Sequence, residues 1–446
     1  MSNAGMMALL LVVSVGLLLF LVMKVKLHAF VSLLVVSIFM GLISGMDVST
    51  IMGSIQNGMG GTLGFIATVV GLGAMFGKML EISGGAERLA RTFINAFGVD
   101  KSPWAMVISG FLVSIPVFFD VGFIILVPLV YALAKETKKS TLIYGIPLLA
   151  GLAVTHAFVP PTPGPILVAN LVGADLGKVI LIGIVAGIPA AILAGPVFGN
   201  YIGTKIKADV PDYMDIDNTV IEVKDSDLPG FGTIFALIMV PIVLILLNTV
   251  ASAFLPEGGM RTFLNFVGHP FFALTLACIL SFYILGKFKG LSAQQVQDVA
   301  SAALTSTGMI ILVTGAGGVF KQVLVDSGIG KTLAEALSQY SMSPIILAFL
   351  IALVVRVAAG SATVAMTTAG AIIAPLLVNF NVEPALIVVA IASGSTALSH
   401  VNDSGFWLVN RYFGINEKDT LKSWTVMETI IGVTGLCMAL ILNIFL

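Results

Sequence analysis

The stretch GSTALSHVNDSGFW, residues 394–407, places a run of polar side chains in the middle of a long apolar segment. That segment, residues 386–412, is long enough to cross a bilayer, which takes about 20 residues. A helix in the hydrocarbon core cannot expose such groups to lipid, so they must face protein or a water-filled cavity. Because each ionisable group at that depth costs about 2.5–3.5 kcal/mol on insertion scales, we interpret the stretch as a functional site. Its candidate ligands are Ser395, Thr396, His400, Asn402 and Asp403.

The composition is that of a polytopic membrane protein. Of 446 residues, 58% are hydrophobic and 10% charged, and the mean hydropathy is +1.08. Soluble domains carry about 25% charged residues. With a net charge of −1, no nucleic-acid partner is expected. The sequence has no phosphate-binding glycine motif, no metal-spaced Cys/His cluster and no soluble catalytic domain, so we expect no cofactor, no metal site and no enzyme activity.

Hydropathy and helix-breaking residues predict about ten full spans and two hairpins. The spans are 6–23, 28–46, 61–80, 142–173, 179–203, 232–254, 269–286, 306–326, 382–412 and 424–446. Segments 104–134 and 344–378 are too long for one span, and each has a break near its middle. We expect each to enter and leave the membrane on one side. The predicted fold is all-α, with two re-entrant hairpins and with discontinuous helices in 142–173 and 382–412.

The second half of the chain repeats the first. GLGAMFGKMLEISGGAERLA (71–90) aligns without gaps on GAGGVFKQVLVDSGIGKTLA (315–334). The histidines also form two pairs at similar offsets: His28 with His269, and His156 with His400. We therefore expect a first repeat over 1–204, a cytoplasmic linker over 205–230 and a second repeat over 231–446.

The basic residues predict the orientation. With the N-terminus outside, 17 of the 22 lysines and arginines fall on the cytoplasmic side, as the positive-inside rule prefers. These are Lys24, Lys26, Lys78, Arg88, Arg91, Lys101, Lys135, Lys138, Lys139, Lys205, Lys207, Lys224, Lys287, Lys289, Arg411, Lys418 and Lys422. Both termini are then extracytoplasmic, and the repeats begin on opposite sides. Two inverted copies with interrupted helices are typical of a secondary transporter.

The first half contributes one hairpin tip, residues 115–123, and one helix break, residues 155–166. At the tip, Asp120 either binds a coupling proton or caps a half-helix. At the break, half-helix N-termini suit an anionic group. His156 either relays protons or is a hydrogen-bonded core residue. The candidate ligands here are Pro116, Phe119, Asp120, Thr155, His156, Thr162 and Gly164.

The second half contributes the tip at 356–370 and the break quoted above. Gly360, Ser361 and Thr363 offer hydroxyls and backbone amides that suit a carboxylate or sugar hydroxyls. Arg356 has three open roles: it clamps a substrate carboxylate, pairs with an acid or reaches the outer interface. The four elements are expected to meet near the membrane midplane, with Asp120, Asp403 and His156 as candidates for proton coupling.

At these motifs the chain resembles the gluconate permease family, the gluconate:proton symporters of the ion-transporter superfamily. The motifs are GGTLGF (60–65), LGAMFGK (72–78), FFDVGF (118–123), THAFVPPTPGP (155–165), GAGGVFKQVLVDSG (315–328), GSATVA (360–365) and SHVNDSGFWL (399–408). The resemblance implies uptake of a sugar acid with a proton across the bacterial inner membrane. It also implies a homodimer with a scaffold part and a moving part that holds the hairpins. Family members commonly have glutamate in the place of Asp120 and histidine in the place of Thr162.

Three alternatives stay open at this point. One is a carrier of the same fold for another small carboxylate, such as D-serine or a hydroxy acid, coupled to sodium or protons. Another is an intramembrane hydrolase that uses His400 and Asp403 with Ser399 or Ser404, although no separate oxyanion element is evident. A channel is the third, but duplicated hairpins would be superfluous in a static pore.

Overall fold

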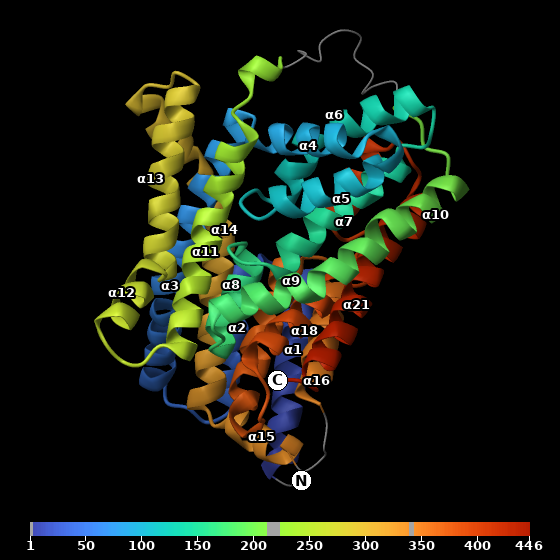
Figure 1. The fold of residues 1–446 in the computed structure, drawn as a ribbon. Coiled ribbons are helices and arrows are strands. Elements are labelled where there is room, and N and C mark those ends of the chain that lie inside the picture. Colours follow the sequence, from blue (N-terminus) through green and yellow to red (C-terminus); the bar gives the residue numbers. More distant parts are fainter. Residues whose placement is uncertain (1–2, 212–223, 339–342) are drawn as a thin grey trace.

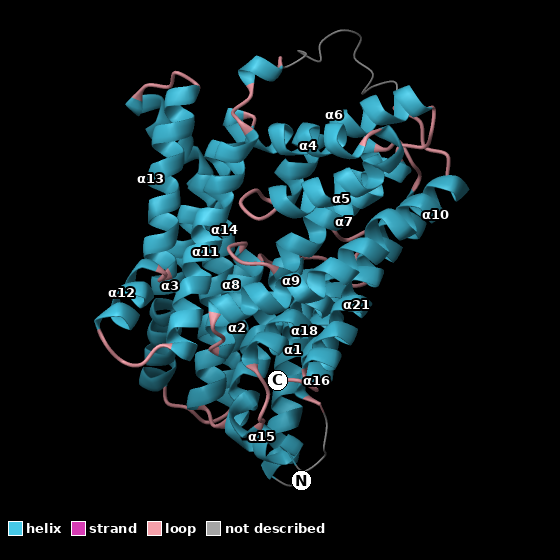
Figure 2. Cartoon of the chain, viewed as in Figure 1, coloured by secondary structure: helices cyan, strands magenta, loops and turns pink. Residues whose placement is uncertain are grey.

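The computed structural model describes residues 3–211, 224–338 and 343–446, and these residues form helices with no strand among them (Figure 2). The first half contains α1 (Asn3–Met23), α2 (Ala29–Ile43), α3 (Val48–Ser83), α4 (Gly85–Phe97), α5 (Ser102–Val113), α6 (Phe119–Thr137), α7 (Leu142–Phe158), α8 (Pro163–Val172), α9 (Leu176–Ile192) and α10 (Phe198–Lys205). The second half contains α11 (Phe231–Phe254), α12 (Gly259–Val267), α13 (Pro270–Phe288), α14 (Ala293–Asp326), α15 (Ile329–Ser338), α16 (Pro344–Ala359), α17 (Ala362–Ile373), α18 (Pro384–Thr396), α19 (Ser404–Tyr412), α20 (Glu417–Thr420) and α21 (Val426–Leu442). Single π-helical turns, Leu193–Val197 and Leu421–Thr425, join α9 to α10 and α20 to α21.

In the described part of the chain, eight helical stretches are long and apolar enough to cross a membrane. Helix α2 and the interrupted pair α18–α19 bring the total to the ten expected spans. The two hairpins are α5–α6 and α16–α17, and the interrupted spans are α7–α8 and α18–α19. The predicted all-α fold with two inverted halves, each holding a hairpin and a discontinuous helix, is confirmed.

Two helices begin earlier than hydropathy predicts. Helix α3 starts at Val48 rather than at residue 61, because the Asp47 side chain accepts the Thr50 N–H at 3.0 Å and caps it. Helix α14 starts at Ala293 rather than at residue 306, where Ser292 and Gln295 form a capping box. Both extensions are polar, so a hydropathy window does not include them. At 36 and 34 residues, these helices exceed what a bilayer core requires.

Helices α3 and α14 pack along each other and form a layer with α11 and α13 (Figure 1, left). Small residues allow the close approach. A Cβ on Gly58 would lie 2.6 Å from the Gly318 carbonyl oxygen, and a Cβ on Gly318 would lie 2.0 Å from the Thr62 hydroxyl oxygen. Helix pairs in lipid are held mainly by such close packing, because lipid tails are as apolar as leucine side chains.

The packing around this pair is exchanged between the halves. Helix α2 packs on α14, and its counterpart α13 packs on α3. The two helices also begin alike: His28 accepts the Phe30 N–H at 3.2 Å, and His269 accepts the Phe271 N–H at 3.3 Å. One histidine pair found in the sequence therefore consists of helix caps. The exchange is what a two-fold relation between the repeats produces.

The segment expected to be a linker, 205–230, lies partly outside the described residues, and its described ends are anchored. The Thr141 N–H donates to the Ala208 carbonyl at 2.8 Å. At the other end, Arg88 of α4 donates to the Pro229 carbonyl at 2.8 Å and pairs with Asp225 at 3.0 Å. The ends of this segment thus pack on the first half of the chain.

The close contact between α3 and α14 predicts that one added methyl group at Gly58 lowers the stability of the protein. Replacing Gly58→Ala drives a Cβ into the backbone of α14, so we expect a lower thermal stability, by about 1–3 kcal/mol. Gly64→Ala on the same helix is the control, because nothing lies within 4 Å of its Cβ position. Alanine favours a helix over glycine by about 1 kcal/mol, so the control should be neutral or slightly stabilising. Equal melting temperatures of the two purified variants would contradict this packing.

Candidate functional site

The tip of the first hairpin lies against the first helix break. The ring of Phe118 meets the His156 ring edge-on, with centroids 6.5 Å apart. Pro116 and Thr162 line a small pocket together with residues of α3. Its cavity volume of about 10 Å³ is about the least that can hold one water molecule. The first tip and the first break therefore meet, as expected from the sequence.

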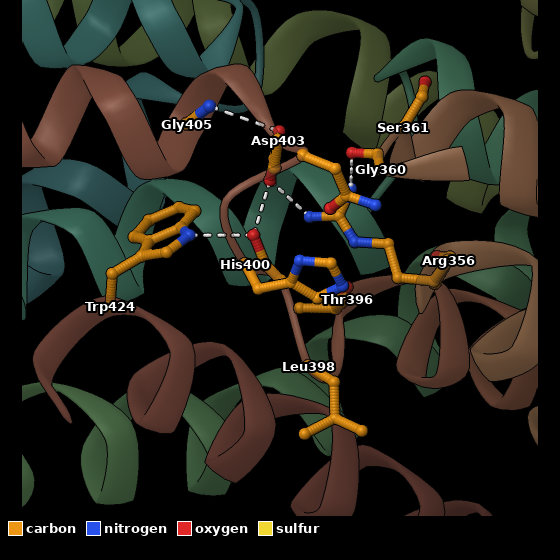
Figure 3. A network of polar contacts seen from close by, with 12 residues as sticks. Arg356, Gly360, Ser361, Thr396, Leu398, His400, Asp403, Gly405 and Trp424 are labelled. Carbon is orange, nitrogen blue, oxygen red and sulfur yellow. Dashed lines mark hydrogen bonds and ion pairs between the residues drawn. The ribbon is translucent and has the colours of Figure 1, made fainter. Parts of the chain in front are cut away.

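The tip of the second hairpin is tied to the second break by a buried ion pair (Figure 3). One terminal nitrogen of the Arg356 guanidinium pairs with Asp403 Oδ2, and the other donates to the Gly360 carbonyl. The Arg356 side chain is 3% exposed and that of Asp403 15%. Of the three roles left open for Arg356, the structure shows pairing with an acid.

Asp403 also organises the break itself. Its Oδ2 accepts the Ser399 hydroxyl at 2.5 Å, and its Oδ1 accepts the Gly405 N–H at 3.2 Å, which caps α19. The Trp424 indole donates to the Ser399 hydroxyl at 2.8 Å. Trp424 in turn lies 5.6 Å, centroid to centroid, from Phe119 at the start of α6. The first tip is thus connected to the second break.

His400 and Asn402 both contact the carbonyl of Val357, in the last turn of α16. The distances are 3.1 Å from His400 Nε2 and 2.9 Å from Asn402 Nδ2. A carbonyl at the end of a half-helix has no partner within that helix, and lipid cannot supply one. The second break supplies it here, so these two side chains help to support the hairpin backbone.

Two glycines set how closely the elements approach. Gly360 has φ +74°, and a Cβ there would lie 2.2 Å from the Asn402 carbonyl oxygen. Only glycine combines that backbone conformation with so close a contact. At the first break, a Cβ on Gly164 would lie 2.5 Å from the Met366 sulfur of α17. The second hairpin therefore packs on both breaks.

Four of the hydroxyls predicted as ligands donate to nearby carbonyls. Thr155 donates to Phe111 at 2.8 Å and Thr162 to Val159 at 2.7 Å. Ser395 and Thr396 both donate to Ala392 at 2.8 Å. Their hydrogens are engaged inside the protein in this conformation. By contrast, Ser361 and Thr363 at the second tip are partly exposed, and Ser361 caps α17 by accepting the Val364 N–H at 3.3 Å. Ligand roles for all six stay predictions.

Asp120 occupies the first turn of α6, and its side chain is exposed on the protein surface. It lies close enough to Asp403 for the two charges to repel. His156 differs, since its Nδ1 is buried and has no hydrogen-bond partner within the described ranges. The three residues predicted to handle protons thus have different surroundings: Asp403 is paired, Asp120 is exposed and His156 has one unpaired nitrogen.

The sequence interpretation missed Glu428. This residue is the one acid of α21, is 4% exposed and lies near Arg356 and Asp403. A single acid in an otherwise apolar final span was the signal available, by the same reasoning that selected Asp120.

Ser399, His400 and Asp403 do not form the relay expected of a hydrolase. Ser399 donates directly to the Asp403 carboxylate, and His400 Nε2 contacts a backbone carbonyl instead of lying between the two. A nucleophile–base–acid relay needs the histidine in that middle position.

Comparison with known proteins agrees with this arrangement. The model of the GntP family of permeases matches residues 6–445. A gluconate permease of Pseudomonas aeruginosa is 42% identical over 428 residues, covering 96% of this chain and 95% of that protein. A low-affinity gluconate transporter of Escherichia coli K12 is 42% identical over 432 residues, with 96% of each chain covered.

Among solved structures, MtrF of Neisseria gonorrhoeae superposes with a TM-score of 0.70 at 14% identity, covering 96% of this chain and 97% of that one. Such a likeness concerns the fold alone. Hairpins and interrupted helices that meet in a polar cluster, together with a family match over nearly the whole length, lead to one conclusion: this chain belongs to the GntP family of permeases.

Proposed function

We propose that this protein is a secondary transporter that carries gluconate or a related sugar acid, together with a proton, across the bacterial inner membrane. The substrate class follows the gluconate carriers that share about two-fifths of its residues. The carrier mechanism is supported by two hairpins and two broken helices that end at one polar cluster. The positive charges on one side support extracytoplasmic termini, and the family resemblance supports a homodimer.

One observation supports an anionic substrate. Four helices, α6, α8, α17 and α19, begin at the tips and breaks, and each N-terminus has a partial positive charge. Two of them already have an acid: Asp120 in the first turn of α6 and Asp403 at the cap of α19. The first turns of α8 and α17 have none. These two N-termini are therefore the places for a substrate carboxylate.

The side chains beside those N-termini complete the proposed pocket. Ser361 and Thr363 supply hydroxyls at α17, and Thr162 and Gly164 form the start of α8. The exposed side chain of Asn402, in the second break, contacts the second tip and is proposed to bind the polyol chain. Asp120 carries the proton: an anion enters beside it when it is neutral and is repelled when it is charged. Asp403 is less suited to this task, because its carboxylate already has Arg356 as a partner.

The first prediction concerns Asp120. Replacing Asp120→Asn removes the titrating group and keeps its shape, so accumulation driven by a pH gradient should be lost while gluconate exchange continues. The measurement is labelled gluconate uptake into proteoliposomes, with and without an imposed gradient.

Asp100→Asn is the matched control, because Asp100 is exposed at a connection outside the site. This variant should accumulate gluconate like the unchanged protein. Undiminished gradient-driven uptake by Asp120→Asn would refute its role. Uptake that follows sodium at constant pH would instead favour the sodium-coupled carrier.

The second prediction concerns the ion pair that closes the pocket. Arg356→Met leaves the Asp403 carboxylate in a largely buried position without its partner, which should cost about 3–5 kcal/mol of stability. The double variant Arg356→Met/Asp403→Asn removes both charges, so it should regain part of that loss. Thermal unfolding of the purified proteins measures both.

Lys178→Met serves as the control for this pair. Lys178 pairs with Glu383 at 2.7 Å, but its side chain is 49% exposed. Exposed pairs contribute about 1 kcal/mol or less, so this change should have little effect. The single variant Asp403→Asn gives the reference. If adding it to Arg356→Met lowers the stability by as much as it does in the unchanged protein, the two side chains act independently.

A further inference from the structure

Glu428 lies about one helical turn after Trp424, on the side of α21 that packs against the second break. On the same side, the Thr425 hydroxyl donates to the Ser399 carbonyl, and the Leu398 N–H donates to the Thr429 hydroxyl at 3.2 Å. Further along, a Cβ on Gly432 would lie 2.5 Å from the Ser393 carbonyl oxygen. The carboxyl group of Glu428 is therefore buried against protein beside the second break.

The surroundings of this carboxyl group favour its neutral form. Glu428 is 4% exposed, and its Oε1 has no hydrogen-bond partner in the parts of the chain that are described. An ionised carboxylate with an unpaired oxygen in such a place is costly, whereas a protonated one is much less so.

The nearest charges belong to the ion pair. Arg356 attracts a charge on Glu428, and Asp403 repels it. Both guanidinium terminal nitrogens are already engaged with Asp403 and Gly360. The remaining donor, Arg356 Nε, is buried and has no acceptor among the described residues. An unused donor of the guanidinium and an unused oxygen of Glu428 thus lie in one buried region.

Other ionisable groups on the helices packed against α21 are few. Helix α18 and the turn Leu193–Val197 carry none, and α9 carries only Lys178, near its N-terminus. Helix α7 carries Tyr144 and His156, and the turn before α21 carries Lys422, which is 54% exposed and pairs with Asp419. Burial is therefore the main influence on the protonation of Glu428, and Arg356 and Asp403 are the charged groups that act on it.

We propose that Glu428 is a second proton-binding site, and that release of its proton to water draws Arg356 away from Asp403. The Arg356 guanidinium is then shared between Asp403 and Glu428. As a result, the contact between the second hairpin tip and the second break weakens. When Glu428 is protonated, the Arg356–Asp403 pair is intact, and the pocket is closed between the second tip and the second break. This inference rests on the proposed function, because it assumes that the pocket between these elements binds the substrate.

The test uses the Asp120→Asn background, so that Asp120 does not titrate. Exposed carboxyl groups are ionised at pH 7, since their ordinary pKa lies near 4. An infrared band of a protonated carboxylic acid at pH 7 should therefore be present in Asp120→Asn and absent from Asp120→Asn/Glu428→Gln. Glu417→Gln in the same background is the control, because Glu417 is exposed at the start of α20, and it should keep the band.

The second measurement is gluconate exchange at equal pH on both sides. Substrate exchange needs the closed pocket, so in Asp120→Asn it should fall about tenfold per pH unit once Glu428 loses its proton and the Arg356–Asp403 contact weakens. Asp120→Asn/Glu428→Gln, which cannot become charged, should keep its rate over that range. The same infrared band in both variants, or the same alkaline fall, would overturn the proposal. If the proposed function were wrong, the unchanged protein would not accumulate gluconate under a pH gradient. The infrared result would still decide whether Glu428 is protonated.

Discussion

The structure depends on one constraint: backbone groups cannot be left without partners in the hydrocarbon core, yet several helices end there. Arg356 meets this constraint at the second hairpin, where it donates to the Gly360 carbonyl and pairs with Asp403. His400 and Asn402 meet it at the Val357 carbonyl. The polar stretch that interrupts the last long segment is therefore first a means of satisfying broken backbone, and the proposed pocket is built on that support.

The halves share a plan but differ in chemistry. The first tip, with Phe118 and Phe119, makes ring contacts with His156 and Trp424. The second tip is held by an ion pair and by close approach at Gly360. A contact between neutral rings does not depend on charge, whereas a buried ion pair requires two intact charges. The second hairpin is therefore the one whose position depends on an ion pair.

Much of the fold could be predicted from the sequence, because it follows from local physics. Apolar length gave the spans, and the prolines of 155–166 marked the first break. The offset between matching histidines indicated the duplication, although His28 and His269 are caps rather than ligands. The starts of α3 and α14 were misplaced, since caps and polar turns outside the apolar core decide them. Glu428 was missed although a single acid in an apolar span is a local signal; its position near Arg356 and Asp403, which lie more than 20 positions away, is not encoded locally.

The sequence by itself determined that the chain crosses the membrane many times, that it does so in two related halves, and which segments are interrupted. These properties depend on the hydropathy and breaking residues of single segments. Only the tertiary structure decided the partner of Arg356, the engagement of the Thr155, Thr162, Ser395 and Thr396 hydroxyls, and the burial of Glu428. Pairing and burial depend on distances between elements far apart in the chain, and no local pattern encodes those distances.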